Sequence, residues 1–188
     1  MLVAYFVYSV ALYVYPAIWA YFTQARFGWG TQMVGVSLAV YGLSSAAVQI
    51  WLIRIMLRRF GERRTVIYGM VFEIAAVLAL AIVGNGMVAL ILTPLAALGA
   101  VITPALQGIM SARVSDDAQG ELQGVLTSVY ALAVIVSPLM MTSVFAAFTA
   151  PGAAVYVPGA PFVVAALLLA GALAILWRMP DTAERAVS

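Results

Sequence analysis

The chain has 188 residues, of which 65% are hydrophobic and 9% are charged, and its formal net charge is +2. A soluble domain carries about 25% charged residues, so this composition indicates a membrane protein. The sequence contains no cysteine and no histidine, which excludes a disulfide framework and any thiolate or imidazole metal site. All nine basic residues are arginines that mostly flank apolar segments, an arrangement that membrane topology explains better than nucleic-acid binding does.

Six apolar segments predict an all-α membrane protein with six transmembrane helices. In chain order they lie near residues 2–22, 34–57, 65–83, 88–110, 122–148 and 160–179. Each is long enough to cross a hydrocarbon core of about 30 Å as a helix, whereas a barrel strand would need about 10 residues of strict alternation. Residues 1–179 are therefore expected to form one membrane domain, followed by a polar cytoplasmic tail at residues 180–188. The first segment has no basic flank before it, which argues against a signal peptide.

The connections between these segments carry turn residues and set the orientation. The first three are "RFGWGT" (26–31), "RRFGERR" (58–64) and "GNG" (84–86), followed by "RVSDDAQGE" (113–121) and "APGAAVYVPGAP" (150–161). Successive connections alternate between the two sides of a membrane. Eight of the nine arginines then share a side with the two termini, and only Arg26 lies opposite. This asymmetry predicts that both termini are cytoplasmic.

A single acidic residue, Glu73, lies near the middle of the predicted third helix. A charged side chain there costs at least about 2.5–3.5 kcal/mol on insertion scales, and desolvation favours the neutral form of a carboxyl group. Glu73 is therefore a candidate proton carrier. The alternatives are a carboxylate that reaches the membrane interface and one that pairs with an arginine such as Arg54.

Other polar side chains within the segments are candidates for a substrate site. Gln49 lies inside the second segment and can bind a ligand or equally a neighbouring helix. Further candidates for the lining of a cavity are Tyr41, Ser45, Gln107, Gln123 and Ser128, and for the two glutamines helix–helix hydrogen bonding is the favoured alternative. The sequence shows no nucleophile–base pair, metal cluster or phosphate-binding glycine loop, so it predicts neither an enzyme nor an ATP-driven pump.

Several motifs resemble those of the major facilitator superfamily. The segment "LRRFGERR" (57–64) matches the loop motif of that family at Arg59, Gly61, Arg63 and Arg64. The sequence departs from the motif at Arg54, where the family has glycine, and at Arg58, where the family has aspartate. Five stretches resemble the bacterial tetracycline/proton antiporters in the same order and with nearly the same spacing: "RFGW" (26–29), "VGVSLAVYG" (34–42), "FGERR" (60–64), "PALQGIMS" (104–111) and "QGELQGVLTS" (119–128). The resemblance covers about residues 15–149 and corresponds to the seventh to twelfth helices of the family.

The resemblance implies half of a major facilitator fold, and specifically the C-terminal six-helix half of a proton-coupled drug efflux transporter that works by alternating access. In the antiporters an acidic residue of the ninth helix follows a glycine, as Glu73 follows Gly69, and a glutamine of the eighth helix matches Gln49. The resemblance thus implies roles for both residues in drug–proton exchange. No cofactor is expected, and magnesium would enter only as part of a chelated tetracycline.

The same resemblance implies where the chain is located and which partners it has. The expected location is the bacterial inner membrane, and the expected partners are lipid, a small-molecule drug and an N-terminal six-helix half. That half would come from the same full-length chain, which would make this a partial sequence, from another subunit or from a second copy. An exporter of another small solute and a truncated membrane module that does not transport are the alternative functions.

Overall fold

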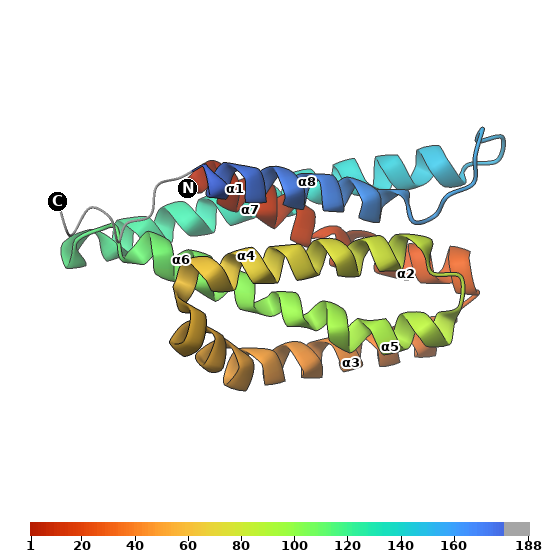
Figure 1. Ribbon diagram of the computed structural model, residues 1–188. Helices are drawn as coiled ribbons and strands as arrows, with labels where there is room; N and C mark the ends of the chain where they lie inside the picture. The colour runs from red at the N-terminus through yellow and green to blue at the C-terminus, as the bar shows by residue number, and fades with distance from the viewer. Residues whose placement is uncertain (179–188) are drawn as a thin grey trace.

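The computed structural model describes residues 1–178 and consists of long helices with no strand in that part of the chain (Figure 1). The first half contains α1 (Leu2–Leu12), α2 (Val14–Phe27), α3 (Thr31–Ala47), the π-helical η1 (Val48–Leu52) and α4 (Ile53–Ile82). The second half contains α5 (Gly86–Ala96), the 3-10 helix η2 (Ala97–Val101), α6 (Ile102–Ser111), the short η3 (Asp116–Ala118), α7 (Gln119–Thr149) and α8 (Ala160–Trp177). The all-α membrane fold expected from the sequence is confirmed.

Continuous helical stretches long and apolar enough to cross a membrane number five in the described residues: Leu2–Phe27, Thr31–Ile82, Gly86–Ser111, Asp116–Thr149 and Ala160–Trp177. The second has 52 residues, which is more than twice the length that one crossing needs. It bends at Gly61, whose φ of 74° and ψ of 173° fall in a region that essentially only glycine adopts. The bend divides this stretch into two crossings, so the five stretches make six passes. The end of the predicted sixth segment, Met179, and the tail at 180–188 lie outside the described residues.

Two of the crossings are interrupted where prolines remove backbone hydrogen bonds. Helix α1 ends at Leu12, and Pro16, four residues later, has no N–H to donate to the Leu12 carbonyl. In the same way Pro104 cannot donate to Ala100, which lies in the 3-10 helix η2. Each of these crossings therefore contains a joint within the depth of the bundle.

Helix α4 lies at the centre of the bundle, beside α8, α5 and α6, while α1 packs against α7 and α8 (Figure 1). Aromatic side chains fill part of the interior, and the rings of Phe22 on α2 and Phe162 on α8 have centroids 4.9 Å apart. In the most apolar 18-residue window of Asp116–Thr149, which contains α7, 17% is buried inside the bundle. The corresponding share for Leu2–Phe27 is 56%. Helix α7 thus leaves most of its surface without a partner in this chain.

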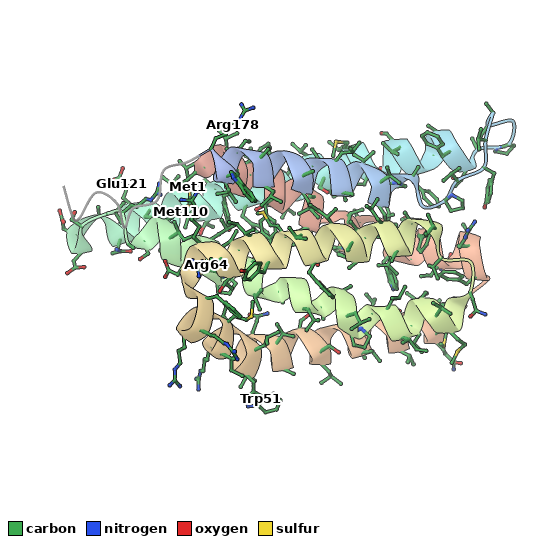
Figure 2. The ribbon with its side chains drawn as sticks, in the orientation of Figure 1. Met1, Trp51, Arg64, Met110, Glu121 and Arg178 are labelled. Carbon is green, nitrogen blue, oxygen red and sulfur yellow. The ribbon has the colours of Figure 1, made fainter. Side chains whose placement is uncertain are left out.

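The two ends of the bundle differ in what they carry. Figure 2 shows Met1, Arg64, Glu121 and Arg178 toward the same end, and Figure 1 shows the connections between α4 and α5 and between α7 and α8 at the other. An even number of crossings returns the chain to the end where it began, which agrees with this arrangement of termini and connections.

Candidate functional site

The carboxyl group of Glu73 is enclosed in the interior of the bundle. Glu73 lies in α4 and is 1% exposed. The phenol groups of Tyr8, Tyr15 and Tyr41 lie near enough to interact with it electrostatically, from α1, α2 and α3 respectively. On another side lies the backbone of η2, where a Cβ built on Gly99 would overlap the Glu73 carboxyl group. Three crossings besides that of α4 therefore surround the carboxyl group, and at these positions they supply hydroxyl groups and a bare backbone rather than charged side chains.

Hydrogen bonds do not compensate for the burial of this carboxyl group. In the described residues, three buried side-chain atoms lack a hydrogen-bond partner, namely Tyr15 Oη, Ser45 Oγ and Glu73 Oε2. Buried polar atoms are nearly always paired in folded proteins, so unpaired ones call for an explanation. Arg54, the cation considered as a partner from the sequence, is exposed, and no ion pair joins it to Glu73. The burial of Glu73 also rules out a carboxylate that reaches the interface.

The three tyrosines differ in what their hydroxyl groups contact. Tyr8 Oη is 2.9 Å from Thr103 Oγ1 and shares a hydrogen bond with it. The rings of Tyr15 and Tyr41 have centroids 5.6 Å apart, and the Tyr41 hydroxyl lies beside Ser45 one turn further along α3. The structure therefore places Tyr41 and Ser45, two of the predicted cavity residues, near Glu73.

Sequence reasoning missed Tyr8, Tyr15 and Gly99. Tyrosines within an apolar segment and a glycine in the middle of a span were visible signals, because each is a departure from a purely apolar pattern. Their approach to Glu73 depends on the packing of three separate crossings, and spacing along the chain does not reveal it.

A small cavity adjoins the site. It has a volume of about 20 Å³ and is lined by apolar surface of Tyr15, Trp19, Leu38, Tyr41, Leu80, Thr93 and Ala96. Such a volume accommodates about one water molecule, whereas pockets for drug-sized ligands measure about 300–1,000 Å³. A drug does not fit in this cavity.

The predicted glutamine candidates occupy other parts of the bundle. Gln49 lies in η1 with its side chain exposed, and it makes no hydrogen bond to another described residue. Gln107 is half-buried, and its Nε2 donates to Tyr5 Oη at 3.4 Å, which is the helix–helix contact considered as its alternative role. Gln123 and Ser128 lie exposed on α7, where Ser128 Oγ donates to the Gly124 carbonyl at 2.9 Å.

The loop-motif residues surround the bend at Gly61. Thr65 Oγ1 donates to the Gly61 carbonyl at 2.7 Å, and Arg63 Nη2 donates to the Trp177 carbonyl at 3.4 Å, which ties the bend to the end of α8. Arg59 lies over the ring of Phe60, with its guanidinium carbon 5.9 Å from the ring centroid. Arg64 is exposed at this end of the bundle (Figure 2). The described residues include no group of three or more side chains that could hold a metal ion.

Comparison with known proteins gives a consistent set of relatives. The family model of the Major Facilitator Superfamily matches residues 1–188. The chain is 35% identical to the tetracycline resistance protein, class C, of Escherichia coli over 147 residues, which is 78% of this chain and 37% of that protein. It is 38% identical to the class G protein of Vibrio anguillarum over 131 residues, covering 70% of this chain and 33% of the relative. The chain thus spans about a third of the length of these curated relatives.

Proposed function

The chain belongs to the major facilitator superfamily, and we propose that it is the C-terminal half of a proton-coupled drug exporter of the tetracycline type. As a member of this family it is a multi-pass membrane protein and a transporter of small molecules rather than an enzyme. The similarity to bacterial tetracycline resistance proteins supports an inner-membrane location and tetracycline as the first substrate to test.

The observation that carries the proposal is the buried Glu73 carboxyl group without a cationic partner. An uncompensated charge at this depth is unfavourable, so the group has a reason to bind a proton in one state of the transport cycle. Release of that proton requires a second state in which water or a cation reaches the carboxylate. A residue with these properties can couple proton entry to a change between outward-open and inward-open states.

The size of the adjoining cavity favours indirect coupling between drug and proton. The cavity of about 20 Å³ is too small for a drug, so we propose that the drug binds between two halves that rock against one another. Protonation of Glu73 would then favour one packing of this half, and drug release outward would accompany proton uptake from the outside. Gln49, exposed on η1, is available to a ligand from outside this half.

An N-terminal six-helix half is the proposed partner. Helix α7 exposes Gln123, Thr127, Ser128 and Tyr130 along with apolar side chains, and polar side chains within a membrane usually face protein or a water-filled cavity. With the arginine-rich end of the bundle placed in the cytoplasm, both termini of this half would be cytoplasmic.

The proposal is tested by replacing Glu73 in the complete transporter reconstituted in proteoliposomes. Glu73→Gln is expected to abolish drug movement driven by a proton gradient while leaving the protein inserted, because the amide cannot gain or lose a proton. Glu73→Asp is expected to retain part of the activity. Glu121→Gln is the matched control, since Glu121 is an exposed acid in the first turn of α7. Wild-type, pH-dependent export of tetracycline by Glu73→Gln would contradict the proposal.

A further inference from the structure

The unpaired polar atoms of the bundle converge on one place. Tyr15 Oη, Ser45 Oγ and Glu73 Oε2 are the buried side-chain atoms without a hydrogen-bond partner in the described residues. Tyr15 lies beside Glu73, and Ser45 lies beside Tyr41, whose ring packs on Tyr15. Random packing defects would be scattered through the chain. Their concentration around one carboxyl group indicates groups that can bond to one another after small adjustments of their side chains.

We propose that Tyr15 is a positioning residue for Glu73, and that its hydroxyl group is the hydrogen-bond partner of the Glu73 carboxyl in both protonation states. This inference rests on the proposed function, in which Glu73 exchanges a proton. It identifies Tyr15 as the residue that holds the carboxyl group in place, and α2 as the helix that responds when the charge of Glu73 changes.

The hydroxyl groups of the other two tyrosines are less suited to this role. Tyr8 is already engaged, because its hydroxyl group shares a hydrogen bond with Thr103. Tyr41 is partly exposed and has Ser45 beside its hydroxyl group. Tyr15 is buried and has no competing partner. Of the three, it alone combines an unengaged hydroxyl group with full enclosure next to the carboxyl group.

The chemistry of a phenol suits a partner that must serve two states. A tyrosine hydroxyl group donates a hydrogen bond to an ionised carboxylate and accepts one from a protonated carboxyl group. No charged side chain competes for this role from the neighbouring elements, because η1, α5, η2, α6 and α8 contain no charged residue. The titratable groups that face Glu73 are the tyrosines Tyr8 on α1, Tyr15 on α2 and Tyr41 on α3.

The position of Tyr15 connects the carboxyl group to a joint in the first crossing. Tyr15 is the second residue of α2, directly after the break between α1 and α2 at Tyr13. On its other side the carboxyl group meets Gly99 in the 3-10 helix η2. When Glu73 gains or loses its proton, donor and acceptor exchange roles in the Tyr15–Glu73 hydrogen bond. This exchange acts on the first crossing at the α1–α2 break and on the fourth crossing at η2. Both helices are already interrupted there, so a change in the angle between their segments breaks few backbone hydrogen bonds.

Infrared difference spectroscopy of the complete transporter in lipid tests the proposal directly. The carboxyl C=O band of protonated Glu73 is identified as the band that Glu73→Gln removes. In Tyr15→Phe this band is expected to move to higher frequency, as in a carboxyl group that has lost a hydrogen bond. Loss of the donor to the ionised form is also expected to raise the proton affinity about tenfold, which moves the midpoint of its titration by about one pH unit.

Tyr8→Phe is the matched control, because it removes the hydroxyl group of another buried tyrosine, one whose partner is Thr103. It is expected to leave both the frequency and the midpoint of the Glu73 band unchanged. A band and a midpoint that stay at their wild-type values in Tyr15→Phe would overturn the proposal while leaving the role of Glu73 intact.

Two further outcomes separate this inference from the proposed function. If Glu73→Gln retains proton-driven export, the proposed function fails, but the carboxyl band still reports whether Tyr15 binds Glu73. If Tyr15→Phe does not fold, the wild-type protein with isotope-labelled tyrosine provides the test. Its tyrosine C–O band is expected to change at the same pH as the Glu73 carboxyl band. A tyrosine band that stays unchanged while Glu73 titrates would overturn the proposal.

Discussion

Glu73 is held by shape more than by polar contacts. Its Oε2 atom has no hydrogen-bond partner, yet the pocket around the carboxyl group leaves no room even for a methyl group on Gly99. A structural carboxylate would be expected to have a cation or several N–H donors near it, because burial of an unpaired charge is costly. A tight pocket without such partners favours the neutral group in this conformation and makes ionisation depend on a rearrangement.

Gly99→Ala tests this reading of the pocket. The new methyl group would displace the carboxyl group, and misplacement of a reacting group by about 1 Å can cost up to about 100-fold in rate. Proton-driven export by the complete transporter is therefore expected to fall by at least tenfold, with an altered pH profile. The measurement is export in proteoliposomes at several pH values.

Gly69→Ala is the control for crowding alone. Its Cβ would lie 2.6 Å from Ile102 Cγ1, and its three nearest atoms belong to Ile102 and Val101, so it crowds the same region of the bundle mainly against apolar side chains. Its stability is expected to fall as well, but the pH profile of export should keep its wild-type shape. An identical change of profile in both variants would mean that packing, and not the carboxyl group, sets the pH dependence.

For this residue, the sequence predicted a position inside an apolar helix, where the structure buries Glu73, but it did not predict the neighbours of the side chain. Depth follows from the distance between Glu73 and the ends of an apolar segment, which can be read along the chain. The approach of Tyr15 and Gly99 follows from contacts between α2, α4 and η2, which are far apart in sequence. Gln49 was an open choice between a ligand and a helix partner, and its exposed position on η1 leaves the ligand role as a proposal.

Among the elements, the bend at Gly61 decides how many times the chain crosses. Its φ of 74° and ψ of 173° cost a residue with a side chain about 1–3 kcal/mol. Gly61→Ala is therefore expected to lower the free energy of unfolding by about that amount, although no atom lies within 4 Å of the added methyl group. The measurement is thermal or denaturant unfolding in detergent micelles.

Gly171→Ala provides the comparison for that strain. Gly171 lies inside α8 with ordinary helical dihedral angles, and its added methyl group also meets no atom within 4 Å. Alanine is favoured over glycine inside a helix by roughly 0.5–1 kcal/mol, so this variant should be neutral or more stable. Equal losses of stability in the two variants would show that the backbone at residue 61 is not constrained as the structure indicates.

A second element-scale prediction concerns the opposite end of the bundle. Arg26 Nε donates to the Val83 carbonyl at 3.0 Å, and its Nη2 donates to the Ile82 carbonyl at 3.4 Å. The guanidinium group therefore caps the C-terminal end of α4, where a positive charge is favourable. Because the contact is partly exposed, Arg26→Ala is expected to lower the free energy of unfolding by only about 1 kcal/mol.

Arg58→Ala is the control for the loss of one arginine. Arg58 is exposed and makes no such contact with the described residues, so its replacement should change stability by less than about 0.5 kcal/mol. An effect of Arg26→Ala no larger than that of Arg58→Ala, measured by unfolding in the same detergent, would contradict the capping role.

The hydropathy of the sequence predicted where the chain crosses the membrane. It did not predict the bends and breaks within the helices, which depend on single glycine and proline residues. The predicted second and third segments form one helical stretch, which bends at Gly61. The joint at Tyr13 is explained by Pro16, but Pro138 in α7 leaves its helix continuous. The same residue type thus has different consequences, because packing against neighbouring helices decides whether a freed carbonyl opens the helix.

For the whole molecule, the arginine asymmetry predicts the orientation. A reporter fused after Ser188 is expected to lie in the cytoplasm, and one inserted within residues 152–159 is expected to lie outside. The structure makes the experiment simple to interpret, since Figure 1 shows the 150–159 connection at the opposite end of the bundle from Met1. A cytoplasmic signal from the 152–159 insertion would contradict the predicted orientation.

If the bundle pairs with a second half as proposed, its exposed surface is divided between lipid and that half, and α7 and α8 are expected to differ in this respect. Ser128 on α7 and Leu167 on α8 are both exposed in this chain. If α7 faces a water-filled passage between two halves, Ser128→Cys should react with a water-soluble maleimide in the complete transporter, and bound substrate should slow the reaction. Leu167→Cys should react slowly, because maleimides of this kind attack the thiolate, which does not form in lipid.

This chain contains no cysteine, so each variant introduces one thiol here, and cysteines elsewhere in the transporter are replaced beforehand. The two maleimide labelling rates are compared with one another, since both side chains are exposed in this chain. Labelling of Ser128→Cys at least tenfold faster than Leu167→Cys would place the passage along α7. Equal slow labelling of both, unaffected by substrate, would mean that α7 faces lipid, and the second half would then have to cover a different face.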